Sequence, residues 1–260
     1  MARYYRELTR LDMEELNKEE TIVMIPLGAI EQHGNHAPLG TDDLIAEKMA
    51  NLILQEVNQI DENFPLLILP NISIGLSTEH ANFCGSLTLS TETYYHMLKE
   101  IIESLYHHGF RKIALLSCHG GNTPIANLLS RELRHSHDLD IFILNSGAFD
   151  DPRVQATISE GNTFDFHGGE METSMIMAID EELVKLDRGI AGQATGYVFD
   201  SKLKEYNISL NWVAEDFVDK DGNPIGIGGD PSGASPEKGQ IIFTVNIEKM
   251  VEGLKYIAGY

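Results

Sequence analysis

Hydrophobic residues fall in short runs that alternate with longer amphipathic stretches. Four of these runs are almost entirely apolar and lie at residues 21–27, 66–69, 112–116 and 140–144. Short apolar runs without polar alternation are typical of parallel strands that are buried on both faces. Their alternation with helical stretches predicts an α/β fold, in which a largely parallel sheet is covered by helices.

Helical spacing or helix-end signals mark the stretches between and after these runs. We predict helices at residues 42–58, 90–108, 122–135, 170–179 and 245–257. Ser90 or Thr91 can cap the second of them, and Gly109 suits its C-terminal stop. Residues 180–240 are rich in glycine and less periodic, which indicates a loop region with short strands that shapes a pocket. Too few apolar residues follow position 180 for a second core, so we expect a single domain over residues 1–260.

The charge balance limits the partners that this chain can have. Its 260 residues include 19 Lys and Arg against 40 Asp and Glu, a net charge of −21. Such a surface repels phosphate backbones and anionic lipids, so we expect a small-molecule substrate and neither nucleic-acid nor membrane binding. The chain shows no signal-peptide pattern and no apolar run near the ~20 residues that span a bilayer. Two cysteines without a CxxC pair favour a reducing compartment and predict a cytoplasmic protein.

Candidate metal ligands follow the first predicted strand. Glu31, His33 and Asp42 lie in the loop after residues 21–27, with glycines and a proline between them that let the loop fold back. Oxygen and nitrogen ligands of these types bind zinc or manganese, and a carboxylate between two ions can bridge them. The alternative reading makes Asp42 a helix cap and His33 an ordinary loop histidine. In open α/β sheets, however, ligands bind outside the carboxyl ends of the strands, where these residues are expected.

A second cluster follows the third predicted strand. His119 is succeeded by Gly120, Gly121 and Asn122. The glycines permit a tight turn, and Asn122 is expected to cap the next helix. A glycine turn with a capping asparagine accounts for every residue here except the histidine. We therefore take His119 as a metal ligand and the three residues after it as substrate-binding candidates.

The third cluster opens the helix predicted at 170–179. His167, Glu170 and Glu172 lie within six residues of one another. Acidic residues are favoured at a helix N-terminus by the helix dipole, which is the structural alternative for Glu170. His167 and Glu172 are residue types suited to acid–base catalysis and to metal binding.

Weaker signals surround these clusters. Residues 77–86 predict a substrate-facing loop, in which His80 either contacts substrate or pairs with Glu79. Cys118 and His119 are neighbours on a strand and so point to opposite sides, which argues against a cysteine nucleophile. The glycines at 226–229 lack the strand-to-helix context of a nucleotide-binding loop.

Taken together, these residues resemble the creatininase (creatinine amidohydrolase) family, and the chain is expected to be a member other than creatininase proper. The resembling segments span most of the chain in order: residues 26–34, 39–42, 119–122, 167–174 and 228–231, followed by Ala234, Glu237, Lys238 and Gly239. The resemblance implies a three-layer α/β sandwich with a mainly parallel central sheet flanked by helices. It also implies two divalent metal ions per chain (Zn, or else Mn or Fe) and a homo-oligomer, commonly a hexamer.

The resemblance also implies roles for individual residues. Glu31 and His119 would bind one ion, His33 the other, and Asp42 would bridge them. In creatininase a glutamate two residues after the strand-end histidine completes the second site, but the corresponding residue here is Gly121. Glu172 is our first choice for the missing ligand and Glu170 our second. Creatininase also has tryptophans around its substrate, whereas this chain has only Trp212.

These residues lead to a mechanistic hypothesis. A metal-bound hydroxide, its pKa lowered from 15.7 to ~7, would attack the carbonyl of a small, often cyclic amide. His167 would protonate the leaving group, and Glu172 or Glu170 would receive the proton of the water. Related reactions are the opening of a ketocyclitol (keto-inositol) ring and the removal of a formyl group, and the family also includes an enzyme that trims a cofactor-precursor peptide. A non-catalytic small-molecule sensor is the alternative from another functional class, and Gly121 is its main support.

Overall fold

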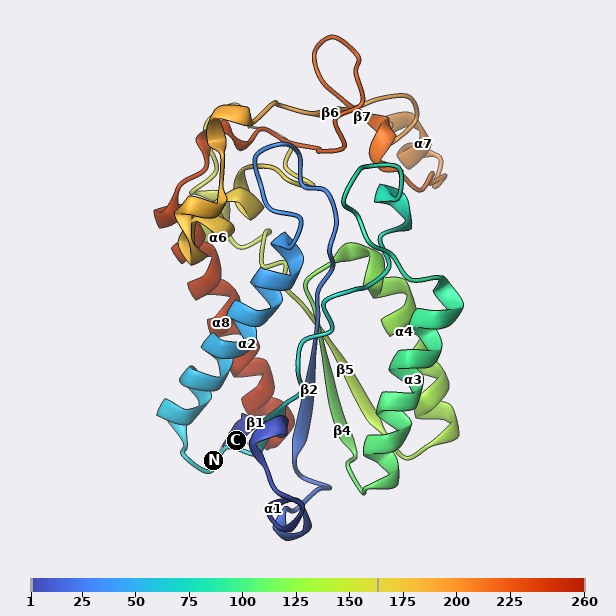
Figure 1. Cartoon of the computed structure of the whole chain (residues 1–260), viewed down its shortest axis with the longest axis vertical. Helices are drawn as coiled ribbons and strands as arrows, with labels where there is room; N and C mark the ends of the chain where they lie inside the picture. The colour runs from blue at the N-terminus through green and yellow to red at the C-terminus, as the bar shows by residue number, and fades with distance from the viewer. Residues whose placement is uncertain (1, 163, 260) are drawn as a thin grey trace.

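The computed structural model describes residues 2–162 and 164–259, and a parallel sheet of five strands lies at its centre (Figure 1). In order across the sheet, the strands are β1 (Arg3–Tyr4), β3 (Leu66–Ile68), β2 (Ile22–Leu27), β4 (Lys112–Ser117) and β5 (Asp140–Asn145). Every neighbouring pair is parallel. The predicted parallel sheet is therefore confirmed, with an additional short strand, β1, that the sequence pattern did not indicate.

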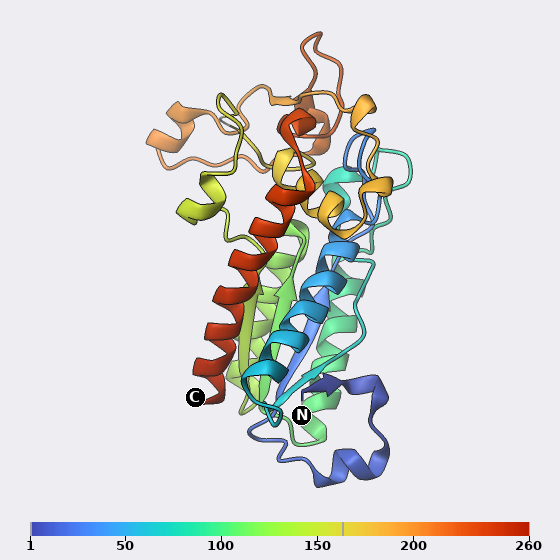
Figure 2. The same cartoon turned by 90° about the vertical axis from the view of Figure 1, so that its left-hand side faces the viewer.

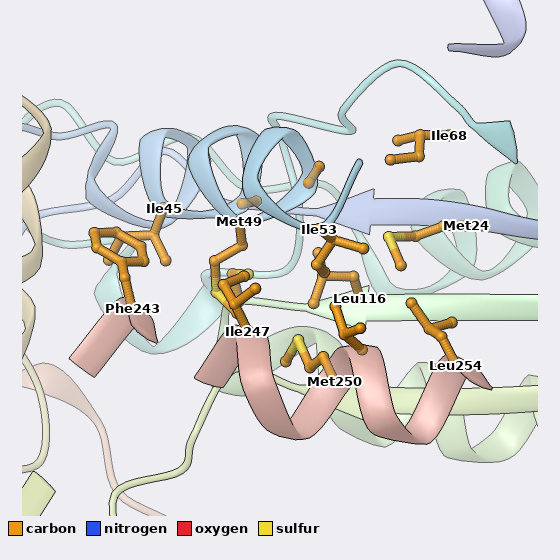
Figure 3. Close-up of a cluster of buried hydrophobic side chains, with 14 of the residues drawn as sticks. Met24, Ile45, Met49, Ile53, Ile68, Leu116, Phe243, Ile247, Met250 and Leu254 are labelled. Atoms are coloured by element: carbon orange, nitrogen blue, oxygen red, sulfur yellow. The ribbon is translucent and has the colours of Figure 1, made fainter. Parts of the chain in front are cut away.

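Helices cover both faces of the sheet. On one face lie α2 (Thr41–Ile60), α6 (Glu170–Ile179) and α8 (Pro236–Ala258), and on the other lie α3 (Thr91–His107) and α4 (Thr123–Ser136). Successive residues of β2 alternate between the two cores, because side chains alternate across a strand: Met24 joins the first and Val23 the second. Figure 3 shows Met24 among side chains of α2 and α8. This arrangement is the expected three-layer sandwich.

Helix α8 begins earlier than the spacing of apolar residues predicts. We expected the last helix to start at residue 245, but it starts at Pro236, after Ser235, whose side chain accepts a hydrogen bond from the Lys238 backbone N–H at 3.4 Å. Gly239 lowers the helix propensity of residues 236–244, which is one reason why the sequence pattern did not predict a helix there. Here it permits close packing, because a β-carbon on Gly239 would lie 1.9 Å from the Ser174 carbonyl oxygen of α6.

Two further expectations are wrong in detail. Strand β5 forms an edge of the sheet and is partly exposed, whereas we predicted burial on both faces. Asn122 does not cap α4 with its side chain. Its amide accepts a hydrogen bond from the Leu76 N–H at 3.0 Å and donates one to the Gly28 carbonyl at 2.9 Å, so it ties together the loops that follow β2 and β3.

The loop region expected at 180–240 lies beyond the carboxyl ends of the strands (Figures 1 and 2). It contains the short hairpin of β6 (Gln193–Ala194) and β7 (Phe217–Val218), and the short helix α7 (Ser201–Glu205). The remaining α-helices of the described residues are the short α1 (Arg10–Glu15) and α5 (Pro152–Gln155). Among the described residues, no helix combines the length and apolar character that a membrane span requires.

Candidate metal centre

The predicted clusters meet at the carboxyl ends of β2 and β4. These strands are direct neighbours, and Leu27 of β2 pairs with Ser117 of β4. The loops that follow them carry Glu31, His33 and His119, so the three side chains lie on the same edge of the sheet. The start of α6 brings Glu172 to them, and His167 comes from the loop just before it.

Asp42 lies between two histidines. It is in the first turn of α2, and its side chain is almost completely buried. Its Oδ1 atom lies 3.4 Å from His33 Nε2, and its Oδ2 atom lies 3.2 Å from His119 Nδ1. The two carboxylate oxygens therefore face two different imidazoles, as a bridging ligand requires.

Glu31 is the most enclosed carboxylate of the centre. Its Oε1 atom lies 3.3 Å from His80 Nε2 and 3.7 Å from His167 Nδ1, and its Oε2 atom lies 3.3 Å from His119 Nε2. Neither oxygen has a hydrogen-bond partner among the described residues, although the side chain is fully buried. A buried carboxylate without such a partner is costly unless a cation or proton compensates it.

Glu172 joins the centre from α6. Its Oε2 atom lies 3.7 Å from His33 Nε2 and accepts a hydrogen bond from the Gly168 N–H at 2.7 Å. Within the described part of the chain, three sets of side chains bring possible ligand atoms within 4.8 Å of one another: Glu31, His33 and Asp42; His33, His167 and Glu172; and Glu31, His80 and His167. The residue types and their mutual distances fit divalent metal ions.

Electrostatics supports the same conclusion. Burial raises the pKa of Glu31 to about 8. Burial alone would lower the pKa of His33, but the Asp42, Glu172 and Glu31 carboxylates together outweigh it and raise that pKa to about 9. Asp42 is also buried, yet His33 and His119 hold its pKa below the ordinary value. The carboxylates thus lie in a site that favours positive charge, and divalent cations would supply it.

In two histidines of the centre, a backbone carbonyl oxygen lies next to one ring nitrogen and leaves the other ring nitrogen facing the centre. His33 Nδ1 lies 3.2 Å from the Glu31 carbonyl oxygen, and His119 Nε2 lies 2.5 Å from that of Leu76. Since a carbonyl oxygen only accepts, each of these nitrogens carries the proton of the neutral ring. His33 Nε2 and His119 Nδ1, which face Asp42, are therefore the nitrogens at which a divalent ion would replace the second proton, an arrangement typical of metal-binding histidines.

Glu170 lies apart from this centre, contrary to its expected role. Its carboxylate forms an ion pair with Lys238 and accepts hydrogen bonds from the Ser159 hydroxyl at 2.8 Å and the Asn162 amide at 2.8 Å. These partners satisfy the buried group, which joins α6 to α8. Its placement therefore supports neither metal binding nor proton transfer, and the structural alternative for Glu170 is the better one.

The candidate substrate residues divide into two pairs. Gly120 and Gly121 line a cavity of about 220 Å³ beside Glu31, Asp42 and Glu172. His80 and Asn122 are fully buried and are not among the described residues that line it. Substrate contact by these two is not supported, because neither lines the cavity: His80 Nε2 lies 3.3 Å from Glu31 Oε1, and Asn122 joins two loops.

Some residues near the cavity were not singled out from the sequence. Glu79 lies with its Oε1 atom 3.7 Å from His119 Nε2, although we considered it only as a partner of His80. Phe149, Phe166 and Trp212 form the aromatic part of the cavity wall. Trp212 comes from the loop region at 180–240 and packs edge-on against His80, with 5.3 Å between ring centroids. No periodic pattern in that region marked it.

Comparison with known proteins agrees with this geometry. The family model described as creatinine amidohydrolase matches residues 6–254. A mycofactocin precursor peptide peptidase from Mycobacterium ulcerans is 31% identical over 88% of this chain and 82% of its own length. A creatinine amidohydrolase from Pseudomonas putida is 29% identical over 65% of this chain and 68% of its own length.

Solved structures share the fold as well. A creatininase in a Mn form superimposes with a TM-score of 0.75 at 26% identity, over 97% of each chain. The match to the family model extends over most of the sequence and includes every cluster of the centre. The chain therefore belongs to the creatininase family.

Proposed function

We propose that this protein is a hydrolase that uses two divalent metal ions to attack the carbonyl of a small amide. The observation that carries the proposal is the position of Asp42, whose oxygens lie 3.4 Å from His33 Nε2 and 3.2 Å from His119 Nδ1. His33 and Glu172 would hold one ion together with Asp42. Glu31 and His119 would hold the other.

The two ions, zinc or manganese, would lower the pKa of a bound water and polarise the substrate carbonyl. The protein contributes rigid and mostly buried ligands, because Glu31, His33 and Asp42 are at most 3% exposed in their side chains. Gly120 leaves its part of the cavity wall free of a side chain, because no atom lies within 4 Å of its β-carbon position, so a substrate can approach the backbone closely there.

His167 is the candidate for proton transfer. Its Nε2 atom lies 2.8 Å from the Gln32 carbonyl oxygen, which requires a proton on Nε2 and leaves a lone pair on Nδ1. The ring lines the cavity beside Glu172. We propose that Nδ1 first accepts a proton from the attacking water and then donates it to the leaving nitrogen, so His167 is a base before it is an acid.

The cavity supports a small substrate with a flat apolar face. Its volume is about 220 Å³, and its wall combines the metal-centre residues with Phe149, Phe166 and Trp212. A cyclic amide fits this description. A ketocyclitol or a formamide is the alternative within the same chemistry, since each presents a carbonyl carbon to the same centre.

Metal content and hydrolysis test the proposal together. Protein purified without chelator would be analysed for metal per chain and then assayed, with zinc or manganese added, against cyclic amides, formamides and ketocyclitols. We expect two ions per chain and hydrolysis that is lost on chelation and restored by metal. At most one ion after supplementation, without turnover, would refute the proposal and favour a non-catalytic sensor.

We also propose that the protein is a homo-oligomer, which the family resemblance suggests is a hexamer. The support is a set of exposed apolar side chains on the segment around α7: Tyr197, Phe199, Tyr206, Ile208, Leu210 and Val213. Apolar groups that are concentrated in this way often mark an interface. Sedimentation velocity would test this, and a monomer at micromolar concentration would contradict it.

A further inference from the structure

Gln32 connects the backbone to two histidines of the centre. Its side chain is buried, and its Nε2 atom lies near three groups: the Gly226 carbonyl oxygen at 2.5 Å, His80 Nδ1 at 2.9 Å and His167 Nε2 at 3.3 Å. An amide nitrogen has only two hydrogens, so it cannot donate to all three. The distribution of these hydrogens fixes the protonation of both rings.

Two backbone groups determine the orientation of the Gln32 amide. The Gly34 N–H donates to Gln32 Oε1 at 3.0 Å, and Gln32 Nε2 donates to the Gly226 carbonyl. Exchange of the amide oxygen and nitrogen would place two donors together at Gly34 and two acceptors together at Gly226. One hydrogen of Nε2 is therefore committed to Gly226, and one remains.

The remaining hydrogen points to His80. His167 Nε2 must carry a proton of its own, because its other neighbour at 2.8 Å is the Gln32 carbonyl oxygen, which only accepts. A donor does not accept from the amide, so the amide donates to His80 Nδ1. In the neutral ring of His80, the proton then resides on Nε2.

This result separates His80 from the other histidines of the centre. His33, His119 and His167 each direct an N–H to a backbone carbonyl, so the nitrogen that each turns inward is the one that can bind a metal ion or a proton. His80 instead accepts at Nδ1 and turns an N–H inward, and its Nε2 atom lies 3.3 Å from Glu31 Oε1. A protonated ring nitrogen cannot ligate a metal, but it can hold a carboxylate in place.

We propose that Gln32 is a positioning residue that sets the tautomer of His80, and that the N–H of His80 in turn attracts Glu31 Oε1 electrostatically at 3.3 Å, outside hydrogen-bond geometry, and leaves Oε2 as the oxygen available to a metal ion. In this arrangement Gln32 and His80 form a layer of residues around the metal ligands. The inference rests on the proposed metal function. His80 would belong to neither metal site, although it lies among residues that can hold an ion.

Nuclear magnetic resonance of protein labelled with ¹⁵N in histidine tests this directly, since protonated and unprotonated ring nitrogens have distinct shifts. The His80 signals would be assigned by their loss in His80→Gln. In metal-free wild type we expect the proton of His80 on Nε2. With ¹¹³Cd bound, we expect cadmium coupling at His33 Nε2 and His119 Nδ1, and none at His80.

Gln32→Met removes the donor and keeps a side chain of similar size. We expect His80 to lose its single tautomer and cadmium affinity to fall ~10–100-fold, as for other outer-layer groups. Gln59→Met, on the exposed side of α2, is the matched control and should change neither. Gln32→Met with an unchanged His80 tautomer would overturn the inference.

Two results on the wild type would also overturn it: a proton on His80 Nδ1, or coupling between cadmium and His80. Failure of the protein to bind cadmium would count against the metal function and not against the tautomer, which is measured in the metal-free protein. The two proposals can therefore fail separately.

Discussion

Glu79 places a carboxylate oxygen 2.7 Å from the point where a β-carbon on Gly121 would lie. That oxygen is also 3.7 Å from His119 Nε2. The resemblance to creatininase implied a glutamate at the position of Gly121, so the sequence suggested that a carboxylate is missing. The structure instead provides one in the same neighbourhood from the 3₁₀ turn Thr78–His80.

This crowding predicts a difference between two adjacent glycines. Gly121→Ala should lower the free energy of unfolding by about 1–3 kcal/mol, because the new β-carbon would lie 2.2 Å from the Leu76 carbonyl oxygen. Gly120→Ala should change it by less than about 0.5 kcal/mol, since no atom lies within 4 Å of its β-carbon position. Urea unfolding of the metal-free proteins would compare the free energies of unfolding of the two variants. Equal losses would contradict the close packing around Gly121.

Asp42→Ala should abolish binding of both metal ions, because this one side chain faces the histidines of both sites. Asp43→Ala is the matched control, since the neighbouring carboxylate accepts a hydrogen bond from Asn71 at 2.6 Å and takes no part in the centre. Elemental analysis after zinc loading would measure the number of ions per chain in both variants. Retention of two ions in Asp42→Ala would exclude a bridging role.

Glu170 and Glu172 are close in sequence but should respond differently. Glu170→Gln weakens the buried pair with Lys238, and we expect a loss of about 1–3 kcal/mol in stability with normal metal content. Glu172→Gln should reduce metal content to about one ion per chain and change the stability of the metal-free protein little. Thermal unfolding and elemental analysis of both variants would measure this, and the reverse pattern would restore Glu170 as a ligand.

His167→Ala should lower kcat ~10²–10⁴-fold, the usual contribution of an acid–base group. We expect two ions to remain, because Glu31, His33, Asp42, His119 and Glu172 are unchanged. His108→Ala, on the exposed end of α3, is the control. Kinetics with the best substrate, combined with metal analysis, separates the roles: loss of metal together with activity would make His167 a ligand.

The two cysteines should differ in reactivity. Burial raises the pKa of the Cys118 thiol, whereas Cys84 is exposed. Because the thiolate is the reactive form, a thiol reagent should modify one cysteine rapidly in the folded protein and the second only on unfolding. Cys84→Ser should remove the fast phase. A fast phase that persists in this variant would show that Cys118 is accessible.

The sequence by itself determined the type of fold and most of the candidate metal centre. Apolar runs such as 112–116 have few other stable environments than the inside of a parallel sheet, so the strands were predictable. The positions of the candidate ligands Glu31, His33 and His119 were predictable for a related reason. Each follows such a strand, and the carboxyl ends of neighbouring parallel strands share one edge.

The tertiary structure decided what depends on contacts between distant segments. Glu170 and Glu172 carry the same chemical group two residues apart, and only the packing of α6 against α8 directs one to Lys238 and the other to His33. Likewise, Gln32 meets Gly226 across 194 residues of chain. Local pattern records residue type and spacing, whereas the partner of a buried polar group is fixed only when the segments that enclose it come together.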